Sequence, residues 1–410
     1  MKAIKFTFDQ GKLSVVCKRS DPANPVCIGM ILRVKRYCII FLGIWKFAFA
    51  YAPEDSNCQN LLDKQLAHYF QSWETTFDST TNGMRTSQGC LDLLNWYIDL
   101  ELRYEAYLSK TLGIRYKNHY LGDYGEHISN HYFQPFFQIR ENERLFLSIT
   151  THYYKGEDEI GIGYFYGKNY LNYIETFLTV ENFDRNFSLQ NMEKGRAKVV
   201  YKGLQYPVKI TITFNKNWAT GRFRTELVLG KAYLLESTDE PATYREKGYA
   251  HSWYFRFWQD IKNLRIGLLN NLRYSTKSVT DSTINMKETI LEEIPELQFT
   301  YRINEKWIPN LYLTYNYKSE DDTLFYERNV YAYLVDLEFY PGGNFVWHFG
   351  TQREFYYNNQ SNNFKERRIN VGMEYRYKKL WFYLVEAMEG DFPTPKYMHN
   401  HTYVQLMIRF

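Results

Sequence analysis

Histidine and serine side chains come first in a search of this 410-residue chain for catalytic chemistry. A hydrolase needs a nucleophilic serine within hydrogen-bond reach of a histidine base. His251 and Ser252 are the only adjacent histidine and serine, but neighbouring residues of the stretch GYAHSWYFRF point to opposite faces of an extended strand. No nearby asparagine or acid completes the arrangement. The sequence therefore predicts no catalytic residues, and we expect the protein not to be an enzyme.

Metal and cofactor chemistry finds no clear motif either. The nine histidines are scattered, the pair in HISNH at 127–131 has helical spacing without a helix, and His399 and His401 fall in a predicted loop. The glycines of GIGYFYG at 161–167 lack the spacing of a phosphate-binding loop, and a strand with room beside it accounts for them. We expect no metal ligands and no cofactor.

Alternating stretches bounded by turn residues fill the chain from about residue 93. In RRINVGMEYRYK the apolar side chains occupy 369, 371, 373, 375 and 377, and polar residues or glycine occupy the even positions. ELQFTYRIN at 296–304 and LRIGLLNNLRY at 264–274 alternate in the same way. A soluble sandwich also alternates, but its polar face favours Lys, Glu, Thr and Ser, whereas this face holds many Arg, Asn, Gly and Tyr. One face therefore suits lipid and the other a crowded aqueous lumen.

The composition agrees with strands in which only every second side chain faces lipid. The chain has 38 Tyr, 29 Phe and 9 Trp, yet its mean hydropathy is −0.51. Nothing beyond the N-terminal region approaches the roughly 20 consecutive apolar residues that a membrane helix needs. Membrane β-barrels combine low mean hydropathy with aromatic girdles, and they are the membrane class that fits.

The N-terminal region has the layout of an export signal. From Met30, a basic region with Arg33, Lys35 and Arg36 precedes the apolar stretch 38–45, and Ala48-Phe49-Ala50 offers a cleavage pattern. We expect residues 1–51 to be a leader that includes this signal peptide, with Met30 as the true start. Residues 52–92 do not alternate cleanly, and we expect a short periplasmic or plug segment or an extra strand pair there. Residues 93–410 would form the barrel.

Removal of the leader changes both charge and cysteine content. Residues 1–51 contain nine lysines and arginines and two acids, so the formal net charge falls from +4 to −3. The clustered basic surface that nucleic-acid binding requires is then missing, and we expect no nucleic-acid partner. Cys58 and Cys90 remain, and either one disulfide or two free thiols fits their spacing.

Connections in the second half of the chain alternate in length. Long ones are expected at 236–248, 276–292, 319–329, 357–366 and 389–400, and short ones at 258–262, 304–309, 341–343 and 378–379. Long external loops and short periplasmic turns are typical of outer-membrane barrels. Five tryptophans lie at or near the short connections, and we expect them to form an aromatic girdle at one membrane interface: Trp218, Trp258, Trp307, Trp347 and Trp381.

The final residues, HTYVQLMIRF, place 404, 406, 408 and 410 on one apolar face and finish on Phe410. This ending, the alternating strands and the export signal resemble those of Gram-negative outer-membrane β-barrel proteins of the porin type. The resemblance implies an all-β, antiparallel up-and-down barrel of about 16–18 strands, with Phe410 as the signal for the barrel-assembly machinery. It also implies outer-membrane lipid and lipopolysaccharide as surroundings, and it leaves the oligomeric state open.

A barrel of this size has an aqueous lumen, and its charged inner residues would select solutes by charge and size. We therefore expect transport of small polar or anionic solutes by passive diffusion. Ion pairing that only stiffens the wall is the alternative for any single arginine. An anchor, assembly or surface-binding barrel is the alternative function, ahead of a barrel lipase or protease. The expected pore-lining residues are Arg222, Arg224, Arg256, Arg265, Arg273, Arg302, Arg368, Arg376, Glu226, Glu296, Asp336, Glu338 and Glu374.

Overall fold

The computed structural model describes residues 4–9, 12–17, 82–89, 97–123, 127–152, 159–181, 201–205, 208–237, 244–280, 285–321, 326–359, 364–391, 394–395 and 401–409. The chain divides into two compact units, Met1–Glu54 and Asp55–Phe410. In the first unit, β1 (Ile4–Asp9) and β2 (Lys12–Cys17) form an antiparallel hairpin. The predicted signal segment, both remaining cysteines and Phe410 lie outside the described residues.

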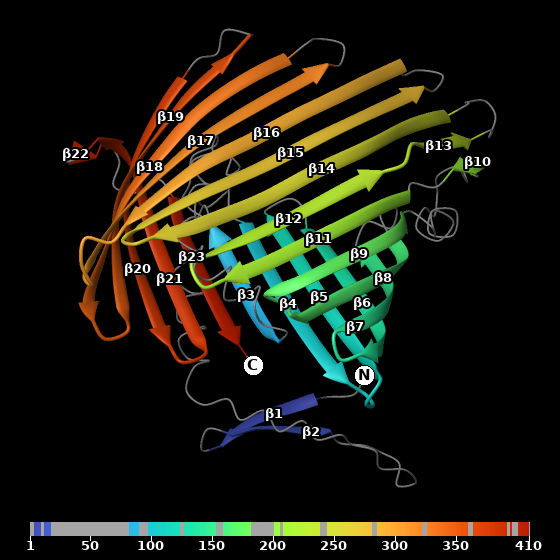
Figure 1. Cartoon of the computed structure of the whole chain (residues 1–410), viewed down its shortest axis with the longest axis horizontal. Coiled ribbons are helices and arrows are strands. Elements are labelled where there is room, and N and C mark those ends of the chain that lie inside the picture. Colours follow the sequence, from blue (N-terminus) through green and yellow to red (C-terminus); the bar gives the residue numbers. More distant parts are fainter. Residues whose placement is uncertain are drawn as a thin grey trace. The chain divides into compact units, whose positions relative to one another are not determined.

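The second unit is a closed antiparallel barrel, and eighteen strands form its ring in the described part of the chain (Figure 1). Neighbouring strands pair in chain order, β9 pairs with β11, and β23 pairs with β3 to close the ring. The first nine ring strands are β3 (Gly83–Gly89), β4 (Tyr97–Tyr107), β5 (Leu112–Asp123), β6 (His127–Arg140), β7 (Glu143–His152), β8 (Glu159–Asn169), β9 (Asn172–Glu181), β11 (Val208–Trp218) and β12 (Gly221–Gly230).

Nine further strands complete the ring: β14 (Tyr244–Ile261), β15 (Leu264–Thr280), β16 (Asn285–Tyr301), β17 (Trp307–Asp321), β18 (Tyr326–Gly342), β19 (Phe345–Asn358), β20 (Phe364–Tyr377), β21 (Leu380–Asp391) and β23 (His401–Arg409). Three short strands add to its margin: β10 (Tyr201–Gln205), β13 (Tyr233–Ser237) and β22 (Thr394–Pro395). The predicted all-β up-and-down barrel of 16–18 strands is confirmed.

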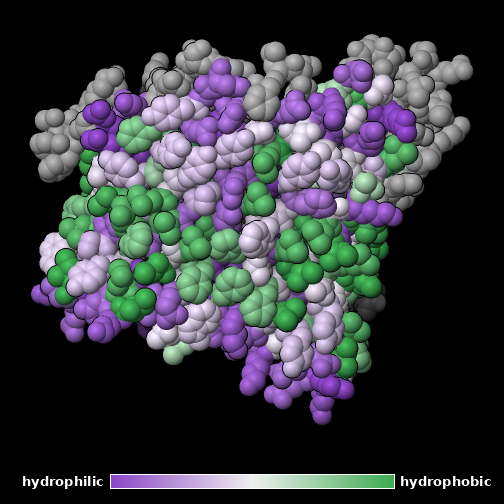
Figure 2. Space-filling model, turned by 45° about the horizontal axis from the view of Figure 1, so that its top comes forward, coloured by the Kyte–Doolittle hydropathy of each residue, from purple (hydrophilic) through white to green (hydrophobic). Residues whose placement is uncertain are grey.

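Burial in the ring is the reverse of that in a water-soluble protein. In β16, Glu296 is 4% exposed and the next residue, Leu297, is 43% exposed; in β18, Asp336 is 2% exposed and Val335 is 42% exposed. Adjacent side chains of a strand point to opposite faces, so polar groups occupy the inside and apolar groups the outside. Figure 2 shows a zone of apolar residues on one side of the barrel, with hydrophilic residues above and below it. Such a band fits the acyl layer of a membrane.

No helix in the described part of the chain combines the length and apolar character needed to cross a bilayer.

Strand lengths correct the predicted loops. Strands β15, β16 and β18 each have 17 residues and β14 has 18, whereas about 9–11 residues cross a bilayer. The segment 276–292 was expected as a long loop, but β15 continues to Thr280 and β16 resumes at Asn285. The same holds for 319–329, where β17 ends at Asp321 and β18 begins at Tyr326. The described residues of these two predicted loops are therefore mostly polar extensions of the strands.

The barrel also begins earlier than the predicted boundary at residue 93. Strand β3 pairs with β4 over Gly83–Gly89 and with β23 over Gly83–Gln88. Its sequence, GMRTSQG, has no alternating apolar residues, which is why the pattern did not reveal it. Arg409 pairs with Gly83, so these ends of β3 and β23 lie at the same end of the ring as the short turns.

Candidate functional site in the lumen

Twelve of the thirteen residues predicted to line the pore lie on the inner face of ring strands, and Arg302 follows the end of β16. Strand registers show it directly, because Arg222 and Arg224 pair with Trp258 and Arg256 across β12 and β14, and Glu296 pairs with Thr314 across β16 and β17. Six members of the set are buried in the wall: Arg222, Arg256, Glu296, Asp336, Arg368 and Glu374. Alternation therefore places the twelve strand residues of the set on the inner face.

Several of these arginines form ion pairs with neighbouring carboxylates. Arg265 donates to both carboxylate oxygens of Asp260, at 2.6 and 3.0 Å. The Arg376 guanidinium contacts both oxygens of Glu374, one of them from Nη2 at 2.9 Å. Arg368 donates to Glu366 at 2.7 Å and is fully buried. These contacts are of the wall-stiffening kind, which sequence analysis had left as the alternative for any single arginine.

A cavity of about 440 Å³ opens into the lumen among β14 to β20, near the short turns. Six of the predicted pore-lining residues meet there: Arg256, Arg265, Arg302, Arg376, Glu338 and Glu374. The turn residues Lys262 and Asn263 also line it, which places the cavity toward the short-turn end of the barrel. The basic and acidic residues here surround one shared space on consecutive strands.

The basic side of the cavity is built around Trp258. Its ring lies 5.5 Å from the guanidinium carbons of Arg222 and Arg256 and 5.9 Å from that of Arg265. Guanidinium groups at this range are attracted to the indole face. Arginines from β12, β14 and β15 therefore lie together around the Trp258 ring on one part of the wall.

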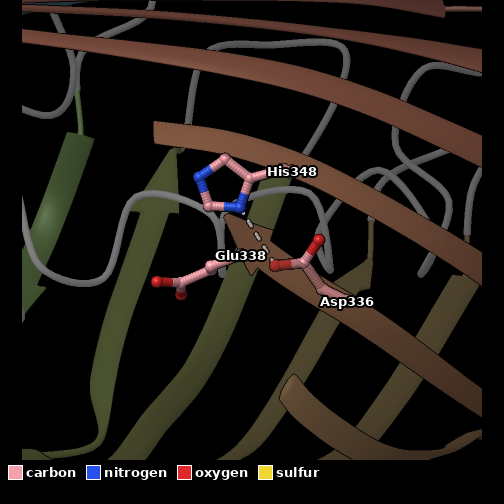
Figure 3. A group of neighbouring side chains, drawn as sticks. All are labelled: Asp336, Glu338 and His348. Carbon is pink, nitrogen blue, oxygen red and sulfur yellow. Dashed lines mark hydrogen bonds and ion pairs between the residues drawn. The ribbon is translucent and has the colours of Figure 1, made fainter. Parts of the chain in front are cut away.

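The acidic side is formed by β17 to β20. His348 on β19 approaches Asp336 on β18, with Nδ1 and Oδ2 3.0 Å apart, and its Nε2 lies 3.8 Å from Glu374. Glu338 accepts hydrogen bonds from Asn310 at 2.9 Å and from Tyr340 at 2.5 Å. Figure 3 shows Asp336, Glu338 and His348 as one group at the β18–β19 hairpin.

Tryptophan placement only partly follows the predicted girdle. Trp218 and Trp347 are 39% and 37% exposed on the outer face, and Trp307 stacks outside on Phe339 with ring centroids 4.3 Å apart. Trp258 and Trp381 instead point inward, and the guanidinium carbon of Arg376 lies 5.0 Å from the Trp381 ring. The prediction was wrong for these two because nearness to a turn indicates height along the barrel, whereas strand parity decides the face.

A second inner cluster fills part of the wall in β4 to β9. Its aromatic core consists of Phe136, Phe146 and Phe165, with Phe177 packed against it. A Cβ atom at Gly163 would lie 2.2 Å from the Phe177 ring, so the glycine leaves the space that this ring occupies. GIGYFYG is therefore a strand with room beside it, as predicted. Charged members complete the cluster: Arg144 donates to Glu105 at 3.0 Å, and Arg115 to Glu175 at 2.7 Å.

His251 and Ser252 lie on opposite faces of β14. His251 pairs with Leu229, which is 42% exposed on the outside, whereas Ser252 pairs with the inner-face residue Arg273. The predicted separation of this pair is confirmed. His131 of HISNH lies in strand β6 and its Nδ1 is 2.8 Å from the Tyr116 hydroxyl.

His348, Asn310 and Tyr340 are among the cavity residues that sequence reasoning missed. His348 alternates with the exposed residues Trp347 and Phe349, so strand parity could have placed it inside. Its meeting with Asp336 and Glu338 could not be foreseen, because it depends on the register between β18 and β19.

The closed eighteen-strand ring, its polar inner face and its apolar outer face define a transmembrane β-barrel of the outer-membrane type. No family model matches the chain, and no curated protein matches it.

Solved structures of outer-membrane proteins are similar to the chain over about four fifths of its length. OccAB3 of Acinetobacter baumannii has 11% identity, covers 80% of this chain and 98% of its own, and has a TM-score of 0.39. OccK2 (OpdF) of Pseudomonas aeruginosa, solved in complex with glucuronate, has 8% identity, covers 80% and 96%, and scores 0.40. A bacterial polysaccharide outer membrane secretin has 10% identity, covers 81% and 99%, and scores 0.42. Because these identities and TM-scores are low, the class assignment depends on the closed sheet of this chain, with its polar inner face and its apolar outer face.

Proposed function

We propose that this protein is a porin-like channel of the Gram-negative outer membrane, through which small polar or anionic solutes diffuse without a chemical reaction. The observation that carries the proposal is the charge of the cavity. Among the described residues that line it, five are cationic, at 256, 262, 265, 302 and 376, and three are carboxylates, at 260, 338 and 374. An excess of positive charge beside a low-dielectric wall raises the local concentration of anions.

Single-channel recording tests this function directly. The refolded chain is inserted into a planar bilayer, and the reversal potential is measured under a salt gradient. We expect stable unitary steps and a reversal potential that indicates preference for the anion. Heat-modifiable mobility shows whether the barrel is folded. A folded barrel that passes no current would contradict the proposed channel function, and a preference for cations would contradict the proposed selectivity.

An anchor or surface-binding role is the second candidate, and the long strand extensions favour it. The hairpins of β14 to β18 exceed the length that spans a membrane and so present folded structure beyond it. A silent but folded barrel that binds a surface partner through these hairpins would support this role.

The proposal includes export and assembly. Cleavage of a signal after Ala50 or Ala52, recognition of Phe410 by the barrel-assembly machinery, and contact with lipopolysaccharide remain predictions from sequence. N-terminal sequencing of the protein recovered from outer membranes would test the first of them, and we expect it to begin within residues 51–53.

A further inference from the structure

Three side chains with metal-binding atoms converge at the β18–β19 hairpin. Asp336, Glu338 and His348 each offer one ligand atom, and these atoms all lie within 4.8 Å of one another (Figure 3). The two acids are separated by one residue on β18, so they share the inner face, and the strand register places His348 directly opposite Glu338. The backbone of a rigid hairpin therefore fixes all three.

In the described part of the chain, neither lysine nor arginine balances the carboxylate charge of Asp336 and Glu338 at this hairpin. Among the described residues, no lysine or arginine nitrogen lies within 4.0 Å of a carboxylate oxygen of Asp336 or Glu338, and the ion pair of Asp336 is with His348. Arg376, which lines the same cavity, makes an ion pair with Glu374. Two carboxylates in a buried wall are costly without a cation to compensate them.

Asp336 carries a second, independent sign of a missing ligand. Its side chain is 3% exposed, and its Oδ1 atom is buried without a hydrogen-bond partner, while Oδ2 faces His348. A buried carboxylate oxygen without a partner has lost its hydration and has gained no hydrogen bond in exchange. A bound cation would supply the missing interaction.

We propose that Asp336, Glu338 and His348 bind one divalent transition-metal ion, with zinc as the representative. An imidazole nitrogen together with carboxylate oxygens is a donor set that suits Zn²⁺, and three protein ligands leave a coordination position open. Both Glu338 and His348 line the cavity, so the open position faces the lumen. A water molecule or an anionic solute group can occupy it.

Isothermal titration of the metal-stripped, refolded full chain with zinc chloride tests the site, and calcium chloride serves as the hard-cation comparison. We expect wild type to bind one more high-affinity Zn²⁺ per chain than Asp336→Asn or His348→Gln. Each substitution should weaken this site by more than the roughly tenfold that loss of an outer-shell partner costs. Asp260→Asn is the matched control, because Asp260 lines the same cavity but pairs with Arg265, and its zinc binding should equal that of wild type.

The proposal is overturned if wild type and Asp336→Asn bind zinc alike, or if Asp260→Asn loses as much affinity. Heat-modifiable mobility shows that each variant is folded, and Glu338→Gln provides a third variant if one of the others is not. The readout is binding and needs no current, so it stands even if the barrel proves not to conduct.

Discussion

Arg302 isolates the effect of one positive charge on solute selection. It lines the cavity and is exposed, so its replacement removes charge from the lumen without opening a gap in the wall. Arg140 is the last residue of β6, at the same short-turn end; its side chain is 78% exposed, and it does not line the cavity. Comparison of the two separates charge inside the lumen from charge at the rim.

Arg302→Gln should lower the anion-to-cation permeability ratio by roughly twofold, because the local potential in the cavity falls. Arg140→Gln should leave the ratio within error of wild type. Reversal potentials in a salt gradient measure both. Equal ratios for all three proteins would show that the cavity does not set selectivity.

Gly163 controls packing rather than charge. Gly163→Val places new atoms where the Phe177 ring lies, and overpacking of this kind costs about 1–3 kcal/mol of unfolding free energy. Ile162→Val on the outer face of the same strand, where Ile162 is 63% exposed, should cost less. Urea unfolding in lipid vesicles measures both. If the two variants lose equal stability, the aromatic cluster does not depend on the space at Gly163.

At the scale of elements, the long hairpins divide into a spanning part and an extension. The spanning part must alternate because one face meets lipid, and sequence analysis found it for that reason. The extension consists mostly of polar residues, so the stretches 276–280 and 285–289 do not alternate and sequence analysis assigned them to a loop. Strand β3 was not predicted for a related reason, because its seven mostly polar residues show no alternation of apolar and polar side chains.

The β15–β16 extension should be dispensable for folding. Ser275 pairs with Ile290, so residues 276–289 can be replaced by an Asn-Gly turn that joins the two strands in register. We expect the shortened protein to refold and to keep its heat-modifiable mobility, because the spanning residues and every inner-face contact of the cavity remain. Failure to refold, seen as loss of the compact band, would show that the extension is needed for assembly.

At the scale of the whole molecule, closure depends on a short seam. Strand β3 contributes seven residues and pairs with β23 over six of them. Without this seam, β4 and β23 would each expose a row of unpaired backbone groups, which in lipid cost several kcal/mol each.

Deletion of Gly83–Gly89 should therefore prevent formation of the compact barrel, although it removes half as many residues as the hairpin replacement. Heat-modifiable mobility and proteolysis in vesicles would report the difference. A compact, protease-resistant deletion variant would mean that β4 pairs directly with β23, and that the ring tolerates one strand fewer.

Sequence therefore predicted the antiparallel ring, a range of 16–18 strands that includes the observed number, and the inner-face position of charged residues such as Glu296 and Asp336, because lipid imposes a period of two on every spanning segment. It did not predict which charges meet. Asp336, Glu338 and His348 come together through the register of one hairpin. Arg376 on β20 and Arg302, just after β16, line the cavity beside Glu338 and His348. Those relations depend on strand stagger around the ring, which alternation alone does not specify.

The cavity lies toward the short-turn end of the lumen, and this position has an electrical consequence. Fixed positive charge near one mouth of a pore makes ion accumulation depend on the direction of the applied voltage. A conducting barrel of this build is a rectifier: anions driven in from the short-turn side enter through the region that concentrates them, whereas anions driven the other way reach it last. Unequal currents at opposite voltages in symmetric salt would then also reveal which way each barrel has inserted into the bilayer.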